Sequence, residues 1–329
     1  MGRTARTVAA ACLLAVAAAE ARAQQAPASQ ESGQGSQGGG QMAVDLVAAE
    51  KALNQTLIAQ GFALLPSGGV QIEPAFTYAR NEISFPSFLN TGGALGTTTV
   101  ANAQLRQNNY IGDIAVRAGL PFGTQVEVDV PYRYLDQRTN VTVGLAGQTI
   151  TGTGSGGGMS DVTATLYKQV LTEGPWRPDV IAAVQYSANT GGVVDGFDLG
   201  NGFPLVRGLL TAVKQVDPIA LAAGLGFGKG LPAPGISPGN EFDTSFGAYL
   251  SASPETTLRL QLNQRFLTDA THDGTTLVGS GLTQATLVAG VAVIVAPHTL
   301  LDVSVGVGLT SDTPKYFLRV SLPITFSVL

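Results

Sequence analysis

Apolar and polar side chains alternate with a period of two along most of the chain after residue 69. The alternation is clear in residues 70–78, 125–134, 257–266 and 316–328. Successive side chains of a β-strand point to opposite faces, so each segment is predicted to be a strand with one apolar and one polar face. In residues 125–134 the apolar positions are Val126, Val128, Val130, Tyr132 and Tyr134, and the polar ones are Gln125, Glu127, Asp129 and Arg133.

Short and long breaks between these segments alternate along the chain. Tight turns are predicted near residues 121–123, 173–175, 217–218, 253–255 and 296–298. Long loops are predicted at 81–103, 136–158, 189–203, 228–240 and 268–281, with the glycine run Gly152–Gly158 as a flexible loop tip. The segments between them give about twelve strands, with starts near residues 70, 104, 125, 160, 179, 204, 219, 241, 257, 282, 299 and 315. This pattern predicts an all-β fold, a transmembrane antiparallel β-barrel of about twelve strands.

Composition favours the same fold. The chain of 329 residues is 44% apolar, only 12% of it is charged, and it contains 42 glycines. Its mean hydropathy is +0.22, yet no run of about 18 uncharged apolar residues follows the N-terminus, which argues against helical membrane spans. A closed barrel is the other structure that satisfies every backbone polar group inside a bilayer.

The N-terminus resembles a secretory signal peptide. Arg3 and Arg6 precede a short apolar stretch, and Ala21-Arg22-Ala23 is a small-residue cleavage site, so residues 1–23 are assigned to the signal peptide. The single cysteine, Cys12, would leave with it; its use as a lipidated residue is a less favoured alternative. Cleavage would change the formal charge from −5 to −7, which argues against a nucleic-acid partner.

Residues 24–41 are rich in Gln, Gly and Ser and are predicted to be a disordered linker. Residues 42–61 are predicted to form an amphipathic periplasmic helix that ends at Gly61. Its apolar stripe is too short to be stable alone, so it needs a partner surface. Three partners remain open: the barrel lumen (the helix as a plug), sister helices (a coiled coil), or the membrane and barrel rim. The stripe contains Met42, Leu46, Leu53 and Leu57. Residues 62–329 are assigned to the barrel.

Polar positions of the alternating segments are predicted to line the lumen. The best candidates for permeation form the densest group: Asp113, Arg117, Glu127, Asp129 and Arg133. Further permeation candidates are Arg259, Arg265 and Arg319, and other lumen candidates include Glu73, Asp161, Gln185, Gln261 and Asp302. Acids and bases are nearly balanced among them, so strong selectivity for simple ions is not predicted. The alternative is that these charges pair across neighbouring strands and only brace the wall.

An enzyme is not predicted. Barrel hydrolases depend on a histidine base, and the chain has only His272, in a polar loop, and His298, in a predicted turn. No cofactor and no metal site are expected.

The junction from Gly61 to Tyr78, which follows a short helix, resembles the start of barrels in the phenol-degradation meta-pathway group. That group is similar to the outer-membrane channel that secretes functional amyloid subunits. The resemblance implies a twelve-stranded channel gated by a periplasmic helical segment, trimeric through that helix, and able to pass small aromatic compounds. The chain departs from many outer-membrane barrels by ending in Leu329, so Phe326 is expected to replace the terminal aromatic residue as the assembly signal.

We therefore expect a channel or transporter in the outer membrane of a Gram-negative cell, with both chain ends in the periplasm. Its cargo would be small solutes, aromatic or hydrophobic ones included, or a secreted polypeptide. Its partners would be outer-membrane lipid, the barrel assembly machinery and, through the helix, two further copies of the chain. A non-conducting adhesive barrel that acts through external loops is the alternative, and an outer-membrane hydrolase ranks third.

Overall fold

The structure is a computed structural model that describes residues 46–91, 97–143, 148–232 and 236–327. By internal contacts the chain divides into residues 1–43 and 44–329, and only the second unit contains described residues. The expected signal peptide, the linker and Met42 therefore lie outside the described part of the chain.

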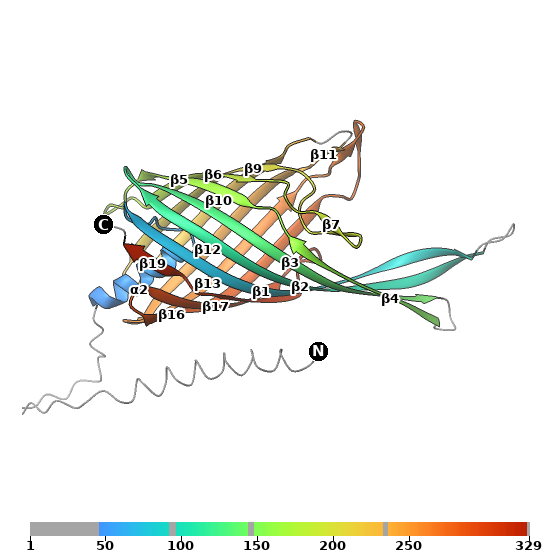
Figure 1. The fold of residues 1–329 in the computed structure, drawn as a ribbon, viewed down its shortest axis with the longest axis horizontal. Helices are drawn as coiled ribbons and strands as arrows, with labels where there is room; N and C mark the ends of the chain where they lie inside the picture. The colour runs from blue at the N-terminus through green and yellow to red at the C-terminus, as the bar shows by residue number, and fades with distance from the viewer. Residues whose placement is uncertain (1–45, 92–96, 144–147, 233–235, 328–329) are drawn as a thin grey trace, which may run out of the picture. The chain divides into compact units, whose positions relative to one another are not determined.

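Twelve strands close into a ring in the described residues, which confirms the predicted fold class. Each strand pairs antiparallel with its neighbours, and β1 closes the ring against β18 and β19 (Figure 1). The strands of the ring are β1 (Gly69–Thr91), β2 (Thr97–Leu120), β3 (Thr124–Val143), β5 (Thr163–Leu171), β6 (Asp179–Ser187), β9 (Leu205–Val216), β10 (Ile219–Gly230), β12 (Asn240–Ser253), β13 (Thr256–Leu267), β16 (Leu282–Ala296), β17 (Thr299–Gly308), and a last strand made of β18 (Tyr316–Ser321) and β19 (Ile324–Ser327). Most predicted starts lie within three residues of these.

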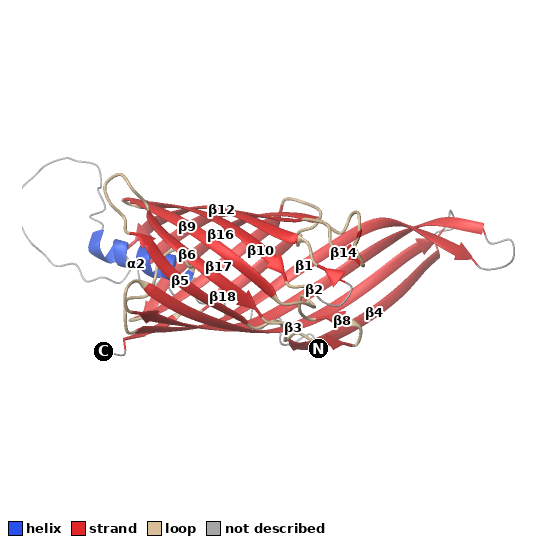
Figure 2. Ribbon diagram, turned by 90° about the horizontal axis from the view of Figure 1, so that it is seen from above, coloured by secondary structure: helices blue, strands red, loops and turns tan. Residues whose placement is uncertain are grey.

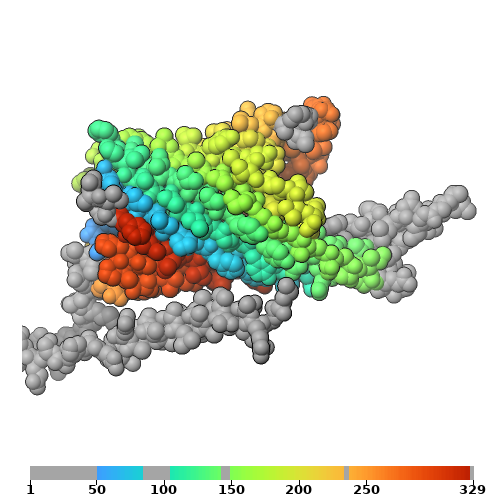
Figure 3. All heavy atoms as spheres, viewed as in Figure 1, coloured from blue at the N-terminus to red at the C-terminus, as the bar shows by residue number. Residues whose placement is uncertain are grey.

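The alternation in the sequence sets which side of the wall each residue faces. In β3, Val126 and Val128 are 37% and 44% exposed on the outer face, whereas Gln125 between β2 and β5 is fully buried on the inner face. Large apolar side chains therefore cover the outside, and most polar ones point inward, as expected for a barrel whose outer face contacts lipid. The strands around β1, β2 and β3 form an unbroken outer wall in the space-filling view (Figure 3).

Two of the predicted long loops are wrong. Strands β1 and β2 pair residue for residue from Val70–Ala118 out to Thr91–Thr97, so most of residues 81–103 is a β-hairpin. Strand β3 likewise continues to Val143 and pairs with β4 (Gln148–Met159), which places Gly152–Gly158 in a strand and not in a loop tip. Backbone pairing continues beyond the ring in both hairpins, and the resulting four-stranded sheet projects past the barrel (Figure 2). The Asn-, Thr- and Gly-rich composition concealed it, because these residues are typical of loops.

The other long connections contain only two-residue strands. They are β7 (Val193–Val194), β8 (Phe197–Asp198), β11 (Ile236–Ser237), β14 (Thr271–His272) and β15 (Thr275–Thr276). Asp161 belongs to this region and not to the middle of the lumen: its carboxylate accepts hydrogen bonds from the backbone of Gly191 (2.8 Å) and Asn201 (2.6 Å). Asp161 thereby holds the 189–203 loop beside the start of β5.

Helix α2 (Leu46–Ala59) precedes the barrel and lies at the end opposite the projecting hairpins (Figure 2). The helix ends at Ala59, and Gly61 follows as the predicted cap, with a φ of 75° in the left-handed region. The Phe62 N–H then donates to the carbonyl of Leu57 at 2.8 Å. No helix in the described segments is long and apolar enough to cross a membrane.

Candidate functional site

Helix α2 packs inside the barrel wall. Leu53 and Leu57 are 2% and 0% exposed and form an apolar core with Phe62 and with inward-facing residues of three strands. Those wall residues are Val213 of β9, Ala220 and Ala222 of β10, and Tyr249 of β12. The ring of Phe62 meets that of Tyr249 edge-on at 5.8 Å. Two of the four predicted stripe residues thus contact the wall; the side chain of Leu46, like Met42, is outside the described part.

A second face of the helix region meets a different part of the wall. Ala59 is buried with Ala292 of β16 and Leu300 of β17, while Asn54 accepts a 3.0 Å hydrogen bond from the side chain of Gln215 in β9. The helix therefore has partners on β9, β10 and β12 and also on β16 and β17. Contact with well-separated strands of one ring means that the helix occupies the lumen at this end.

The segment that joins helix α2 to β1 packs against the wall at the end of β2 and the start of β3. Leu65 N–H donates to the Gln125 side-chain oxygen over 2.8 Å, and Gly68 N–H donates to the Gly119 carbonyl over 3.0 Å. A Cβ added to Gly119 would lie 2.2 Å from the carbonyl oxygen of Pro66, so only glycine allows this close approach. The connection thereby extends the closure begun by the helix.

The sequence contains a signal for this placement that the period-two reading missed. Strands that are polar inside should not be apolar on both faces, yet residues 220–223 and 287–296 are almost continuously apolar. Continuous apolar runs are typical of strands buried on both sides. Here the extra apolar positions, such as Ala222 and Ala292, are those under the helix.

Above the helix, the lumen wall carries a buried ion-pair network, here called the Glu73 cluster. Arg117 of β2 donates to Glu73 of β1 (2.5 Å) and to Glu127 of β3 (2.7 Å), and all three are largely buried. Arg319 of β18 bridges Glu73 (3.4 Å) and Asp113 (3.0 Å). Four of the predicted candidates thus meet on one wall, joined by Glu73.

The remaining candidates lie in separate places. Arg133 of β3 donates to the side chain of Asn109. Asp129 lies on the same face of β3, between Glu127 and Arg133, and is half-buried. Arg259 of β13 is almost fully buried in an ion pair with Asp302 of β17 at 2.8 Å.

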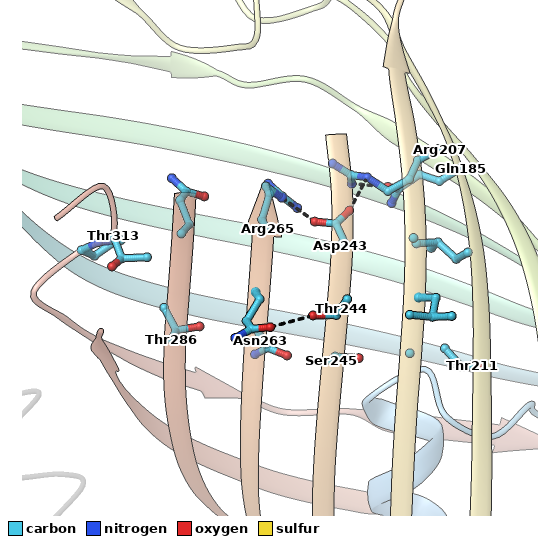
Figure 4. A pocket seen from close by; sticks show the side chains of 17 residues that line it. Gln185, Arg207, Thr211, Asp243, Thr244, Ser245, Asn263, Arg265, Thr286 and Thr313 are labelled. Carbon is cyan, nitrogen blue, oxygen red and sulfur yellow. Dashed lines mark hydrogen bonds and ion pairs between the residues drawn. The ribbon is translucent and has the colours of Figure 1, made fainter. Parts of the chain in front are cut away.

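On another part of the wall, Arg265 belongs to a second network, the Asp243 cluster. Asp243 of β12 accepts a hydrogen bond from Arg265 of β13 at 2.7 Å and forms an ion pair with Arg207 of β9 at 3.2 Å. Arg207 also bonds Glu241 and, at 2.9 Å, the Gln185 side chain. Figure 4 shows Arg265, Asp243, Arg207 and Gln185 side by side on this part of the wall.

The Asp243 cluster borders a cavity of about 480 Å³. Its inward-facing lining also includes hydrogen-bonding side chains from Thr211, Ser245, Asn263, Thr286 and Thr313 (Figure 4). Room for these groups comes from β10, where Gly224 and Gly226 face inward: a Cβ at Gly224 would lie 2.4 Å from the Ser245 hydroxyl. The cavity combines two guanidinium groups, the Asp243 carboxylate, amides and hydroxyls, so it can hydrogen-bond a small polar ligand.

Alternation alone did not identify Arg207 and Asp243 as site residues. In the β9 segment, Arg207 and Lys214 fall on opposite faces, which does not fit a strand with one polar and one apolar face. Lys214 faces outward at the rim, where it bonds Glu173 (2.9 Å) and the carbonyl of Gly174 (2.7 Å), so its charge stays out of the apolar band. With that resolved, Arg207 is an ordinary inward-facing residue.

Neither histidine shows a catalytic arrangement. His272 is exposed beside Asp273 at 3.5 Å, and His298 is exposed in the β16–β17 turn with a φ of 67°. Within the described segments, no group of three or more His, Cys, Asp or Glu residues is placed to hold a metal ion.

No known family profile matches the sequence, and no curated protein sequence matches it. Among solved structures, the COG4313 outer membrane channel from Pseudomonas putida F1 superposes with a TM-score of 0.57 at 15% identity, over 80% of this chain and 97% of that one. The translocator domain of the autotransporter NalP from Neisseria meningitidis has a TM-score of 0.41 at 11% identity, covering 86% of this chain and 98% of that one. At this identity the first likeness establishes the fold, a barrel of the kind seen in outer-membrane channels.

Proposed function

We propose that this chain is an outer-membrane channel for small solutes, with helix α2 as its gate. In this arrangement the end that holds the helix faces the periplasm, together with both chain ends and the short turns. The projecting hairpins β1–β2 and β3–β4 face the outside of the cell. Long external and short periplasmic connections are the usual pattern of bacterial barrels.

The observation that carries the proposal is the placement of an apolar closure directly below a polar cavity. A structural barrel gains nothing from leaving a cavity of about 480 Å³ lined with charged and amide groups. That volume lies in the range of about 300–1,000 Å³ that small-molecule sites occupy. A solute entering from outside would reach the Asp243 cluster first and then meet the helix.

The contact of helix α2 with the wall is weak enough for the helix to undock. Its core against the wall is small, with two leucines and one phenylalanine as its large side chains, and the direct side-chain hydrogen bond to β9 joins two neutral amides. At about 1.5–3 kcal/mol for each large apolar side chain buried, docking is favourable but of a size that binding of a ligand or a protein could offset. The helix would leave toward the periplasm, still tethered to β1.

Small solutes suit the lumen better than a secreted polypeptide does. The Glu73 cluster and the Arg259–Asp302 pair fix the wall with buried ion pairs, and a polypeptide would have to pass this narrow, charged passage in an extended form. Aromatic acids are the cargo we favour: their carboxylate can bind Arg265, and Leu209 provides an apolar contact in the same cavity. This agrees with the resemblance of residues 61–78 to the phenol-degradation group.

A reducible crosslink tests the gate in the complete mature chain, which from Gln24 onward contains no other cysteine. In Asn54→Cys/Gln215→Cys, a short bis-methanethiosulfonate reagent would fix the helix to β9. Liposome swelling with benzoate, glucose and arginine should be blocked by the crosslink and restored by reduction; the single variant Asn54→Cys should not respond. Swelling that is unchanged by the crosslink would contradict gating, and no swelling under any condition would contradict the channel.

A second function is favoured by one observation, the projecting sheet of β1–β4. An adhesive barrel would act through it. Replacing residues 84–103 and 139–152 by tight turns should leave solute uptake unchanged if the chain is a channel. Loss of surface attachment of cells with intact uptake would show that both functions are present.

Partners follow from the same arrangement. Lipid would cover the apolar outer wall, and the assembly machinery would recognise the last strand, where Phe326 is an exposed outward-facing aromatic residue. A trimer through helix α2 would require Leu53 and Leu57 to leave their wall contacts, so we propose that the closed channel works as a single chain.

A further inference from the structure

A row of tyrosines lies on the outer face of the barrel toward the projecting hairpins. Tyr78, Tyr110 and Tyr134 are aligned by the register of β1, β2 and β3, and Tyr316 of β18 is beside them. Their ring centroids are 5.2 Å (Tyr78–Tyr110), 6.1 Å (Tyr110–Tyr134) and 6.2 Å (Tyr78–Tyr316) apart. Tyrosine belts of this kind mark the level of lipid headgroups.

Immediately beyond the tyrosines lies a basic group organised by one carboxylate, here called the Glu82 cluster. Glu82, whose side chain is only 16% exposed, pairs with Lys315 (2.9 Å), Arg106 (3.2 Å) and Arg80 (4.0 Å). The three cations keep between 31% and 56% of their side-chain area exposed. One half-buried acid thus holds three bases near one another while their charged groups remain available to a ligand.

The next strand extends the cluster. Arg138 of β3 is exposed and pairs in register with Arg106, and Asp136 lies one row below it. Four cations and two carboxylates leave two positive charges on this surface, although the whole chain is acidic. On the opposite wall, the corresponding rows hold the phenylalanines Phe227, Phe242 and Phe266, with Lys229 as the basic residue.

Below the tyrosines the same strands present a purely apolar surface, with Phe76, Ile114, Val116 and Val130 all exposed. The surface therefore matches the parts of an anionic glycolipid in their order. Acyl chains would lie against the aliphatic side chains, sugars against the tyrosine rings, and phosphates between the guanidinium groups. Arginine binds phosphate through two parallel hydrogen bonds, which makes adjacent arginines a strong phosphate site.

We propose that the Glu82 cluster and the tyrosine row bind the phosphorylated, acylated glycolipid of the outer leaflet, through the phosphates of its lipid A part. The inference rests on the orientation given under the proposed function, in which this end faces outward. It does not depend on whether the barrel conducts.

The test compares binding of the full mature protein in detergent to bisphosphorylated lipid A and to dephosphorylated lipid A by native mass spectrometry. We expect a preference for the phosphorylated lipid, and a reduction of about tenfold or more in its binding by Arg80→Gln/Arg106→Gln/Lys315→Gln. The matched control Lys229→Gln removes a base from the same end of the opposite wall and should bind as the unaltered protein does. Unaltered heat-dependent gel migration of the triple variant would show that its barrel is folded.

Three outcomes would overturn the proposal: equal binding by the triple variant, equal binding of the dephosphorylated lipid, or displacement of lipid A by millimolar inorganic phosphate, which would indicate a general anion site. A fourth check concerns orientation alone. Arg138→Cys should react with a membrane-impermeant maleimide in intact cells; absence of labelling would show that this end faces the periplasm, whatever the result of the conductance measurements.

Discussion

The side chain of Gln215, on strand β9 of the barrel wall, donates a 3.0 Å hydrogen bond to Asn54 at the middle of helix α2. The two residues are far apart in sequence and lie beside the apolar core of Leu53, Leu57 and Val213. Helix and wall thus share a mixed contact, apolar in its centre and polar at its edge. The position of the helix inside the ring is the basis of the proposed gate.

Weakening this contact should open the channel. Leu57→Asn replaces a fully buried leucine, and losing a buried leucine costs about 2–5 kcal/mol, enough to shift a docked helix by at least tenfold toward release. We expect longer open times in planar bilayers. Lys51→Gln, on the exposed side of the same helix, is the control; equal behaviour of the two variants would contradict the prediction.

The connection after the helix gives a second way to disturb the closure. Gly119→Ala would place a Cβ 2.2 Å from the Pro66 carbonyl oxygen and should displace residues 65–67 from the wall. Gly112→Ala, in the same strand, meets no atom within 4 Å and should be harmless. Limited proteolysis near residue 65, combined with conductance, measures the effect. Protection of the connection in both variants would show that the wall adapts and that the closure does not depend on Gly119.

The Glu73 cluster should matter more for stability than for selectivity. Arg117→Met would leave Glu73 and Glu127 buried without that partner, at a cost of about 3–5 kcal/mol. Unfolding in urea, followed by gel migration, should show this loss. The triple variant Arg117→Met/Glu73→Gln/Glu127→Gln should recover most of it, because no unpaired charge of this trio remains. Arg138→Met, an exposed base on the same sheet, should change little.

Selectivity should depend on the Asp243 cluster. Asp243→Asn removes the charged partner of Arg265, whose side chain is 41% exposed, and leaves Arg207 with Glu241 and Gln185. In a barrel opened by deletion of the helix, the reversal potential in a salt gradient should shift toward anions, because unpaired positive charge on the lumen wall favours them. Asp198→Asn, on an exposed loop, is the matched control. An unchanged reversal potential would show that ions do not pass this cavity.

The fold was predictable to a large extent because its main determinant is local. A strand that faces lipid on one side and a polar lumen on the other must alternate, and the alternation of Gln125 to Tyr134 identifies such a strand without any knowledge of its neighbours. The projecting hairpins were missed because beyond the membrane this requirement no longer holds. Residues 81–103 then look like a loop, although their backbones remain paired.

For the site, the sequence predicted which residues face the lumen but not which of them pair with one another. Alternation put Arg117, Glu127 and Arg319 in the lumen, but which of them pair depends on the register between strands, and Arg319 reaches Asp113 across more than 200 residues of sequence. The place of the helix was left open among three alternatives for the same reason. Its apolar stripe shows that a partner is needed, and only the apolar inner face under it, at Val213, Ala222 and Ala292, shows which partner.

Single-channel conductance of the mature chain, compared with a chain that lacks residues 24–60, tests the central claim most directly. Removal of helix α2 takes away Leu53, Leu57 and Ala59 from the lumen and leaves all twelve strands. We predict that the full-length chain stays closed for most of the recording and that the shortened barrel conducts steadily. Equal conductance of the two chains would contradict the gate, and two silent barrels would contradict the channel.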